Sequence, residues 1–242
     1  MTRTTPIDLN ADVGESFGRW RLGDDAALIP HLTSANVACG FHAGDPRTLW
    51  QTVQTCVAHD VAIGAQVGYA DLVGFGRRAI EVPADDLTAD VLYQLGALDG
   101  LARAAGGAVT YLKPHGALYH RALHDPAQAQ AVIDALLVWP VPLAVMTMSD
   151  GVLARLAANG GLGVIAEGFA DRAYDEGRLV PRDQPGAVLT GDDVVAQAVH
   201  LADDESIRSL CVHGDTPGAV QHAAAIRVAF AAAGIDVRAP GR

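Results

Sequence analysis

The run Ser-Ala-Asn-Val-Ala-Cys-Gly-Phe-His-Ala-Gly-Asp-Pro occupies residues 34–46 and passes from one kind of secondary structure to another. Its opening residues are typical of a buried strand. At its end, Asp45 has the preferences of a helix N-cap and Pro46 those of a first helical position. Strand-to-helix junctions are where α/β proteins hold their functional groups. The run therefore predicts a βα unit with His42, flanked by two glycines, as a candidate functional residue.

The same alternation of a short apolar run and a helical pattern recurs along the chain. Apolar runs predict strands at residues 7–9, 35–39, 61–65, 108–112, 143–146, 162–166, 210–212 and 236–238. Helical patterns, with Asp150 and Thr216 among the expected caps, predict helices at residues 24–32, 46–59, 84–105, 125–138, 150–159, 190–202 and 216–233. No linker or repeat interrupts these seven or eight βα units, so we expect residues 1–242 to form one domain.

Polar side chains follow the ends of at least five of the predicted strands. They are Asn10, Asp12 and Glu15 after the first, His42 after the second, Lys113 and His115 after the fourth, Glu167 and Asp171 after the sixth, and His213 and Asp215 after the seventh. An open sheet gathers its ligand groups at one switch point, whereas a closed barrel brings every strand end to one face. This distribution predicts an α/β fold of the TIM-like β/α barrel type.

Composition narrows the classes of function. The 242 residues are 50% hydrophobic and carry a formal net charge of −11, which disfavours binding to nucleic acid or to an anionic membrane. No apolar run approaches 18 residues, and the first ten residues lack a signal-like apolar segment, so we expect a soluble, cytoplasmic protein. The three cysteines have no framework spacing, and we expect them to be reduced and buried.

Two motifs in the first half of the chain carry ionisable groups. The run 8–15, Asp-Leu-Asn-Ala-Asp-Val-Gly-Glu, places three carboxylates and an amide at one strand end, which suits acid–base work or a hard cation. In the run 112–119, Pro114 keeps Lys113 out of the helical region. Lys113 is the single lysine beside 16 arginines. An ammonium next to the imidazole of His115 suits a phosphate or an oxyanion.

Two further motifs lie in the second half. Arg172, Arg178 and Arg182 follow Glu167 in a long charged stretch and suit a bidentate clamp on a carboxylate or phosphate, although internal Arg–Asp pairs would explain them equally well. In the run 211–218, Cys-Val-His-Gly-Asp-Thr-Pro-Gly, the expected helix start at Thr216 provides free N–H groups for an anion. P-loop, Gly-x-Ser-x-Gly and His-Glu-x-x-His patterns are absent from the sequence.

Taken together, six runs resemble the LamB/YcsF family. They are DLNADVGE (8–15), SANVACGFHAGDP (34–46), LKPHGALYH (112–120), EGFADRAY (167–174), LVPR (179–182) and VHGDTPGAV (212–220). The resemblance implies a seven-stranded β/α barrel similar to the glycoside hydrolase/deacetylase superfamily. It also implies ATP-dependent opening of 5-oxoproline to glutamate, with ATP and Mg²⁺ as co-substrate and two partner subunits, B and C, of a 5-oxoprolinase.

One stretch departs from the family pattern. The family usually has Gly-Ala-His-Pro-Ser-Tyr-Pro-Asp after the third strand, whereas residues 64–71 read Gly-Ala-Gln-Val-Gly-Tyr-Ala-Asp, with Gln66 in place of the histidine. Related deacetylases bind a metal with an aspartate and two histidines, and an amide is a far weaker ligand than an imidazole. Asp12 and His42 remain as candidate metal ligands.

The sequence and the resemblance together assign candidate roles. We expect Asp12 and His42 to act as acid and base, and Lys113 and the helix start at Thr216 to hold a phosphate or oxyanion. One of Arg172, Arg178 and Arg182 would hold the substrate carboxylate, and His115 is a further catalytic candidate. The candidate substrate-binding residues are Asn10, Glu15, Asn36, Glu167, Arg172, Arg182, His213, Asp215 and Thr216. Two other functions stay open: a metal-dependent deacetylase or amidohydrolase without ATP, and a non-catalytic scaffold that binds substrate or partners.

Overall fold

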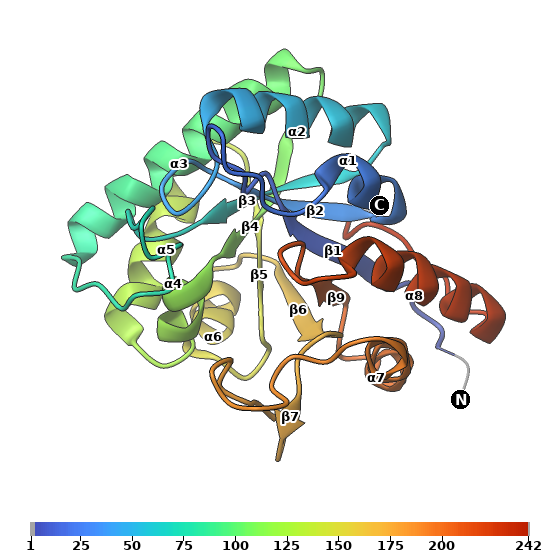
Figure 1. Cartoon of the computed structure of the whole chain (residues 1–242). Coiled ribbons are helices and arrows are strands. Elements are labelled where there is room, and N and C mark those ends of the chain that lie inside the picture. The colour runs from blue at the N-terminus through green and yellow to red at the C-terminus, as the bar shows by residue number, and fades with distance from the viewer. Residues whose placement is uncertain (1–2, 242) are drawn as a thin grey trace.

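The computed structural model describes residues 3–241, and a closed parallel barrel stands at its centre (Figure 1). Seven strands of the described chain close it in the order β1-β2-β3-β4-β5-β6-β9, with β9 paired to both β6 and β1. Their bounds are β1 Asp8–Val13, β2 Ser34–Ala38, β3 Ala62–Val67, β4 Val109–Pro114, β5 Ala144–Thr147, β6 Val164–Phe169 and β9 Ser209–Val212. The predicted barrel is confirmed, with seven strands.

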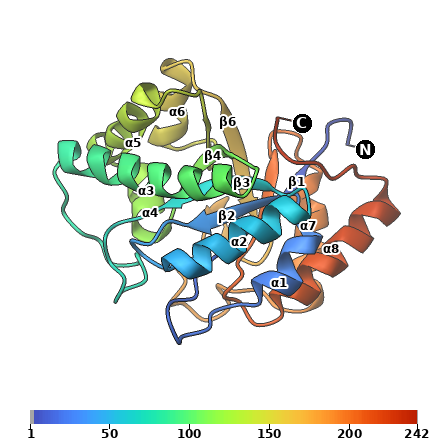
Figure 2. The same cartoon turned by 90° about the horizontal axis from the view of Figure 1, so that it is seen from above.

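Helices surround the barrel, and α2 and α3 run side by side along it (Figure 2). The helical segments are α1 Asp25–Leu28, η1 Ile29–His31, α2 Pro46–Ala58, α3 Ala84–Ala104, α4 Gly116–Ala122, α5 Pro126–Val138, α6 Val152–Asn159, α7 Asp192–Ala202 and α8 Ala219–Ala233. None of the helices described within residues 3–241 is both long and apolar enough to cross a membrane.

The caps show which helix starts the sequence specifies. The side chain of Asp45 accepts hydrogen bonds from the backbone N–H groups of Arg47 and Thr48 at 2.9 and 3.1 Å, as predicted. Three other starts were predicted wrongly. Helices α6, α7 and α8 begin at residues 152, 192 and 219, each after a glycine cap, because Gly191 and Gly218 adopt positive φ angles of 60° and 86° and Gly151 precedes α6 in extended backbone.

Three smaller differences concern elements without a clear sequence signal. Helix α4 directly follows β4, where no helix was predicted. Strands β7 (Tyr174–Asp175) and β8 (Arg178–Leu179) form a hairpin in the loop between β6 and α7, at the lower edge of Figure 1. The strand predicted at 236–238 is reduced to one bridge between Ile7 and Val237.

Strand β1 illustrates how the barrel separates apolar from polar side chains. Leu9 and Ala11 alternate with Asp8, Asn10 and Asp12, as the two-residue period of a strand requires. The apolar set belongs to the large core between barrel and helices. The polar set forms hydrogen bonds to inward-facing side chains of neighbouring strands, so the centre of the barrel is a polar network.

Gly64 of β3 makes room inside the barrel for the ring of Tyr111 on β4. A Cβ atom at residue 64 would lie 2.2 Å from two ring atoms of Tyr111, and the ring is fully enclosed. We expect Gly64→Ala to lower the free energy of unfolding by about 1–3 kcal/mol or more, because the overpacked ring cannot move away. Chemical denaturation measures this loss.

A matched glycine provides the control. Gly100 lies within α3, and a Cβ there would meet no atom within 4 Å. Gly100→Ala should raise the free energy of unfolding by about 0.5–1 kcal/mol through the higher helix propensity of alanine. Equal stabilities of the two variants would contradict this packing.

Asp8 is a buried carboxyl group at the end of the barrel opposite the strand termini that carry the other ionisable groups. The hydroxyls of Thr33 and Ser34 donate to it at 2.6 and 2.7 Å, and that of Ser209 also donates. Burial outweighs these bonds and raises the pKa of Asp8 from its ordinary value of 3.8 to about 6.

The raised pKa of Asp8 has a consequence for stability. The native state binds the Asp8 proton more tightly than the unfolded chain does. The contribution of this proton to the free energy of unfolding is therefore fully present below about pH 4 and is lost as the pH rises through about 6. The difference between a pKa of 3.8 and one of about 6 corresponds to about 3 kcal/mol of stability. We expect Asp8→Asn to remove this slope, measured as the difference in unfolding free energy between variant and wild type from pH 4 to pH 7. Parallel pH curves would contradict the expectation.

Candidate active site

A cleft of about 880 Å³ opens at the C-terminal ends of the strands, and residues of the hairpin β7–β8 contribute to its lining. This volume is typical of small-molecule sites. The described lining includes five permanent cations and three carboxylates: Arg77, Lys113, Arg172, Arg178, Arg182, Asp12, Asp150 and Asp183. A net positive cleft in a chain of charge −11 favours an anionic ligand.

Lys113 forms part of the cleft floor. Its ammonium Nζ donates to Glu167 Oε1 at 2.5 Å and lies 3.3 Å from Cys211 Sγ and 3.4 Å from Asp12 Oδ1. Burial disfavours the charge, but the carboxylates of Asp12 and Glu167 raise the pKa of Lys113 well above its usual range. Lys113 is therefore a fixed cation, 3% exposed, at the bottom of the cleft.

Asp12 stays ionised beside it. Burial alone would raise the pKa of Asp12, but the charges of Lys113 and His213 lower it well below the usual range. Asn36 donates to Asp12 at 2.8 Å and to Asn10 at 2.7 Å. Both asparagines are completely buried below the cleft, so Asn36 positions Asp12 and neither asparagine meets a ligand.

Glu167, also predicted to bind substrate, lies below the cleft in the same way. It is buried, absent from the described cleft lining, and paired with Lys113. Burial raises the pKa of Glu167, although the nearby ammonium opposes the shift. Its visible role is to anchor the lysine.

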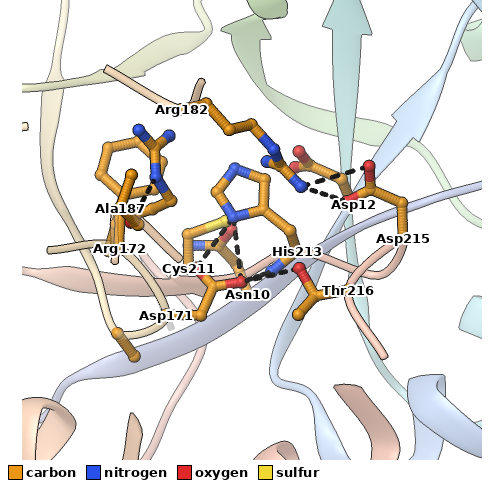
Figure 3. Close-up of polar contacts among 12 residues, drawn as sticks. Asn10, Asp12, Asp171, Arg172, Arg182, Ala187, Cys211, His213, Asp215 and Thr216 are labelled. Atoms are coloured by element: carbon orange, nitrogen blue, oxygen red, sulfur yellow. Dashed lines mark hydrogen bonds and ion pairs between the residues drawn. The ribbon is translucent and has the colours of Figure 1, made fainter. Parts of the chain in front are cut away.

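His213 lines the cleft and is oriented by Asp171, as the dashed contacts in Figure 3 show. Its Nδ1 lies 2.8 Å from Asp171 Oδ1, and its backbone N–H donates to Asp171 Oδ2 at 2.9 Å. Since the carboxylate only accepts, Nδ1 carries the proton and Nε2 is left for a ligand. Burial lowers the pKa of His213, but Asp171 outweighs it and the net shift is upward. This geometry suits a general base.

Thr216 contacts the same carboxylate, that of Asp171, but does not have its predicted role as a helix start. Its hydroxyl donates to Asp171 at 3.3 Å, and α8 begins three residues later, after Gly218. The anion site predicted at a helix start at Thr216 is therefore wrong. The threonine completes the set of donors around Asp171.

His42 and His115 form a stacked pair beside Lys113. Their ring centroids are 3.9 Å apart at an interplanar angle of 9°. Burial and the mutual proximity of the rings lower the pKa of His42 well below its usual value, and burial lowers that of His115 to about 4, so both rings are neutral. His115 lines the cleft, whereas His42 is completely buried and is not among the described lining residues. The structure thus gives the acid–base role expected for His42 no direct access to a ligand.

Arg77, Arg182 and Asp215 meet at the cleft from three different loops. Arg77 Nη2 lies 2.7 Å from Asp215 Oδ2, and Arg182 Nη2 lies 3.3 Å from Asp215 Oδ1. Figure 3 shows Arg182 reaching toward Asp215 above the group around His213. Arg77 was not predicted from the sequence, because no motif surrounds it. Asp171 was predicted only as a strand-end carboxylate, although its run belongs to the family pattern.

Arg172 and Glu15, both predicted to bind substrate, are held or buried within the protein. The guanidinium of Arg172 donates to the carbonyl oxygens of Val180 at 2.6 Å and Ala187 at 3.3 Å, so it holds the β6–α7 loop while one side faces the cleft. Glu15 is buried outside the described lining, and burial together with Asp12 raises its pKa well above the usual range.

Two groups of described residues lie close enough together to be considered as metal ligands, and neither fits. Glu15, His42 and His115 lie within 4.8 Å of one another, but a nitrogen lone pair lies in its ring plane, so two parallel rings cannot aim at one ion. For Asp12, Cys211 and His213, the ammonium of Lys113 already occupies the position beside both the carboxylate and the thiol.

The deacetylase pattern of an aspartate and two histidines also fails. Position 66 is a glutamine, whose Oε1 lies 3.3 Å from His42 Nε2. The side chains described here do not suit a protein-bound metal ion, so the possible ligation by Asp12 and His42 finds no support in the geometry.

The fold and site together define a class: β/α-barrel proteins with a buried ammonium, a carboxylate-oriented imidazole and arginines in one cleft. The chain belongs to the LamB/YcsF family, whose profile matches residues 7–242.

The chain is 51% identical over 247 residues to the A subunit of 5-oxoprolinase from Mycolicibacterium paratuberculosis, covering 96% of this chain and 98% of the relative. The crystal structure of the lactam utilization protein from Thermus thermophilus is 38% identical and superposes with a TM-score of 0.91, covering 97% of this chain and 100% of that one. A T48 deacetylase, 11% identical with a TM-score of 0.50 over 96% of this chain and 87% of that one, shares the fold alone.

Proposed function

We propose that this chain is the A subunit of an ATP-dependent 5-oxoprolinase, which opens 5-oxo-L-proline to L-glutamate. The observation that carries the proposal is the pairing of a fixed ammonium, Lys113, with an oriented imidazole, His213, in one cationic cleft. The names of the relatives in M. paratuberculosis and T. thermophilus support a lactam as the substrate class.

Lys113 and His213 have different roles in the opening of the lactam. The lactam carbonyl oxygen lies against the ammonium of Lys113, which stabilises the negative charge of the phosphoryl group as that group is transferred to the oxygen. His213 Nε2 takes a proton from the attacking water and later returns it to the ring nitrogen when the C–N bond breaks. Asp12, whose pKa is lowered, stays ionised and stabilises the positive charge that His213 acquires in between.

ATP makes the opening of a stable five-membered lactam favourable. Transfer of the terminal phosphoryl group to the lactam oxygen releases ADP and makes the ring carbon more electrophilic. Water then adds to that carbon, the C–N bond breaks, and a second water releases phosphate from the resulting acyl phosphate. Five cations in the cleft suit such anionic species, and Mg²⁺ would accompany ATP.

Partner subunits complete the proposed enzyme. The relatives in M. paratuberculosis and Pseudomonas syringae are named as A subunits of 5-oxoprolinase, which implies a multi-subunit assembly for those proteins. We propose the B and C subunits of such an assembly as the partners of this chain.

The test is glutamate release from 5-oxoproline by this chain with its two partner subunits, with and without ATP. We expect glutamate only when the chain, the partners and ATP are all present. Glutamate formation that continues when this chain is omitted would refute a catalytic role. An assembled complex without any glutamate would point to another lactam or amide.

A further inference from the structure

We propose that Arg77, Arg182 and Asp215 form a subsite for a carboxylate group carried by the substrate. We call these three residues the Arg–Asp–Arg bridge. The inference rests on the proposed function, and it assigns the part of the substrate that does not react. It also identifies Arg77, which no motif marks, as a residue that determines specificity.

The two arginines of the bridge have unused hydrogen-bonding capacity. Each guanidinium has five N–H donors in a planar fork. Within residues 3–241, the side-chain hydrogen bonds of Arg77 and Arg182 use only their Nη2 atoms, and both go to Asp215. Both arginines line the cleft and are 30–40% exposed, so the other edge of each fork is open to a ligand.

The bridge also carries a net positive charge. Two guanidinium groups and one carboxylate leave a net charge of one positive unit, which one carboxylate neutralises. Asp215 is only 12% exposed and holds both arginines in place before the ligand arrives. Such preorganisation reduces the entropy that binding would otherwise lose.

The loop that carries Arg77 packs against the floor of the site. Phe75 has a positive φ of 55°, an unfavourable conformation for a residue with a side chain. Its carbonyl oxygen lies 3.0 Å from His115 Nε2, and its ring packs edge-on against both stacked histidines. The guanidinium of Arg77 lies 4.8 Å from the centre of the same ring.

The neighbouring residues fix this loop further. A Cβ atom at Gly76 would lie 2.7 Å from His42 Cβ, so only glycine fits there. Asp71, 2% exposed, accepts from the N–H of Gly74 at 2.9 Å and from the side chain of Arg78. The stacked histidines thus act as a platform that positions Arg77, which gives the buried His42 a role without ligand contact.

The experiment compares two ligands on the full chain by isothermal titration calorimetry. One is 5-oxo-L-proline, and the other is 2-pyrrolidinone, the same ring without the carboxylate. We expect Arg77→Gln and Arg182→Gln each to weaken 5-oxoproline binding by about ten- to a hundredfold, the effect of a lost charged hydrogen bond, and to leave 2-pyrrolidinone binding within twofold. Arg77→Lys should give an intermediate loss, since it keeps the charge but not the fork.

Arg227→Gln is the matched control, because Arg227 is exposed on α8, outside the described cleft lining. It should change neither affinity, and thermal melting confirms that each variant is folded. Unchanged 5-oxoproline affinity in both glutamine variants would overturn the subsite. An equal loss of affinity for both ligands would also overturn the subsite, and would show that the bridge only holds the loops together.

Two further probes separate this inference from the proposed function. One result is that succinate binds wild type and loses its affinity in both glutamine variants, while neither lactam binds wild type. That result would support the carboxylate subsite and refute the lactam function. If inorganic phosphate alone depends on the two arginines, the carboxylate assignment is overturned in favour of a phosphate subsite. Absence of binding by all four probes refutes the subsite.

Discussion

Replacement of Lys113 by methionine will lower the rate of glutamate formation by the assembled enzyme by about 10²–10³. The loss corresponds to about 3–4 kcal/mol of transition-state stabilisation, typical of a preorganised oxyanion donor. Lys113 is suited to this role because its charge is fixed by Asp12 and Glu167 and costs no reorganisation during the reaction. The measurement is kcat with saturating 5-oxoproline and ATP.

Removing Lys113 also leaves two buried carboxylates without their cation, which threatens folding. The double variant Lys113→Met with Glu167→Gln removes one of these charges and keeps the shape of the site, so it separates catalysis from stability. Cys211→Ala, which removes only the thiol at 3.3 Å from Nζ, serves as the local control and should keep most of the activity. Activity of the double variant within twofold of wild type would show that Lys113 has no such role.

The second large effect concerns His213 and Asp171. His213→Gln removes the proposed base and should lower kcat by about 10²–10⁴. In wild type, activity should fall as the pH drops through the raised pKa of His213, because the protonated ring cannot accept a proton from water. Asp171→Asn removes the group that raises this pKa. The acidic limb of the pH–rate profile, where activity falls with pH, should therefore move to lower pH, and the maximal rate should also fall.

The pH profile distinguishes this mechanism from a structural role. A merely structural Asp171 would lower the rate at all pH values without moving the limb. An acidic limb that stays in place in both variants would assign the proton transfer to another group. Thr216→Val, which removes the weaker 3.3 Å bond to Asp171, should shift the limb only slightly.

Much of the fold could be predicted from the sequence, because strand and helix periods and the Asp–Pro caps are local signals. Asp45–Pro46 and Asp125–Pro126 begin helices as predicted, since the aspartate accepts from the free N–H groups of the first turn. The starts after Gly191 and Gly218 were missed because a positive φ at glycine places the helix beyond the residue with the better capping side chain.

The candidate site was only partly predictable, for a different reason. Strand-end residues such as Lys113 and His213 reach the cleft because a barrel brings all strand ends to one face. Whether a side chain faces the ligand or supports another depends on contacts between distant segments. His42 lies behind His115, and Arg77 reaches Asp215 from 138 residues away, and neither relation has a sequence signal.

The central claim is that a lactam lies in the cleft with its carbonyl oxygen against the ammonium of Lys113. Isotope-edited infrared spectroscopy of 5-oxoproline labelled with ¹³C at the ring carbonyl tests this contact most directly. A charged hydrogen bond polarises the carbonyl, so its stretching frequency should drop on binding to wild type below the value in water. The drop should be lost in the Lys113→Met, Glu167→Gln double variant. An unshifted band in wild type, or the same shift in both proteins, would contradict the claim.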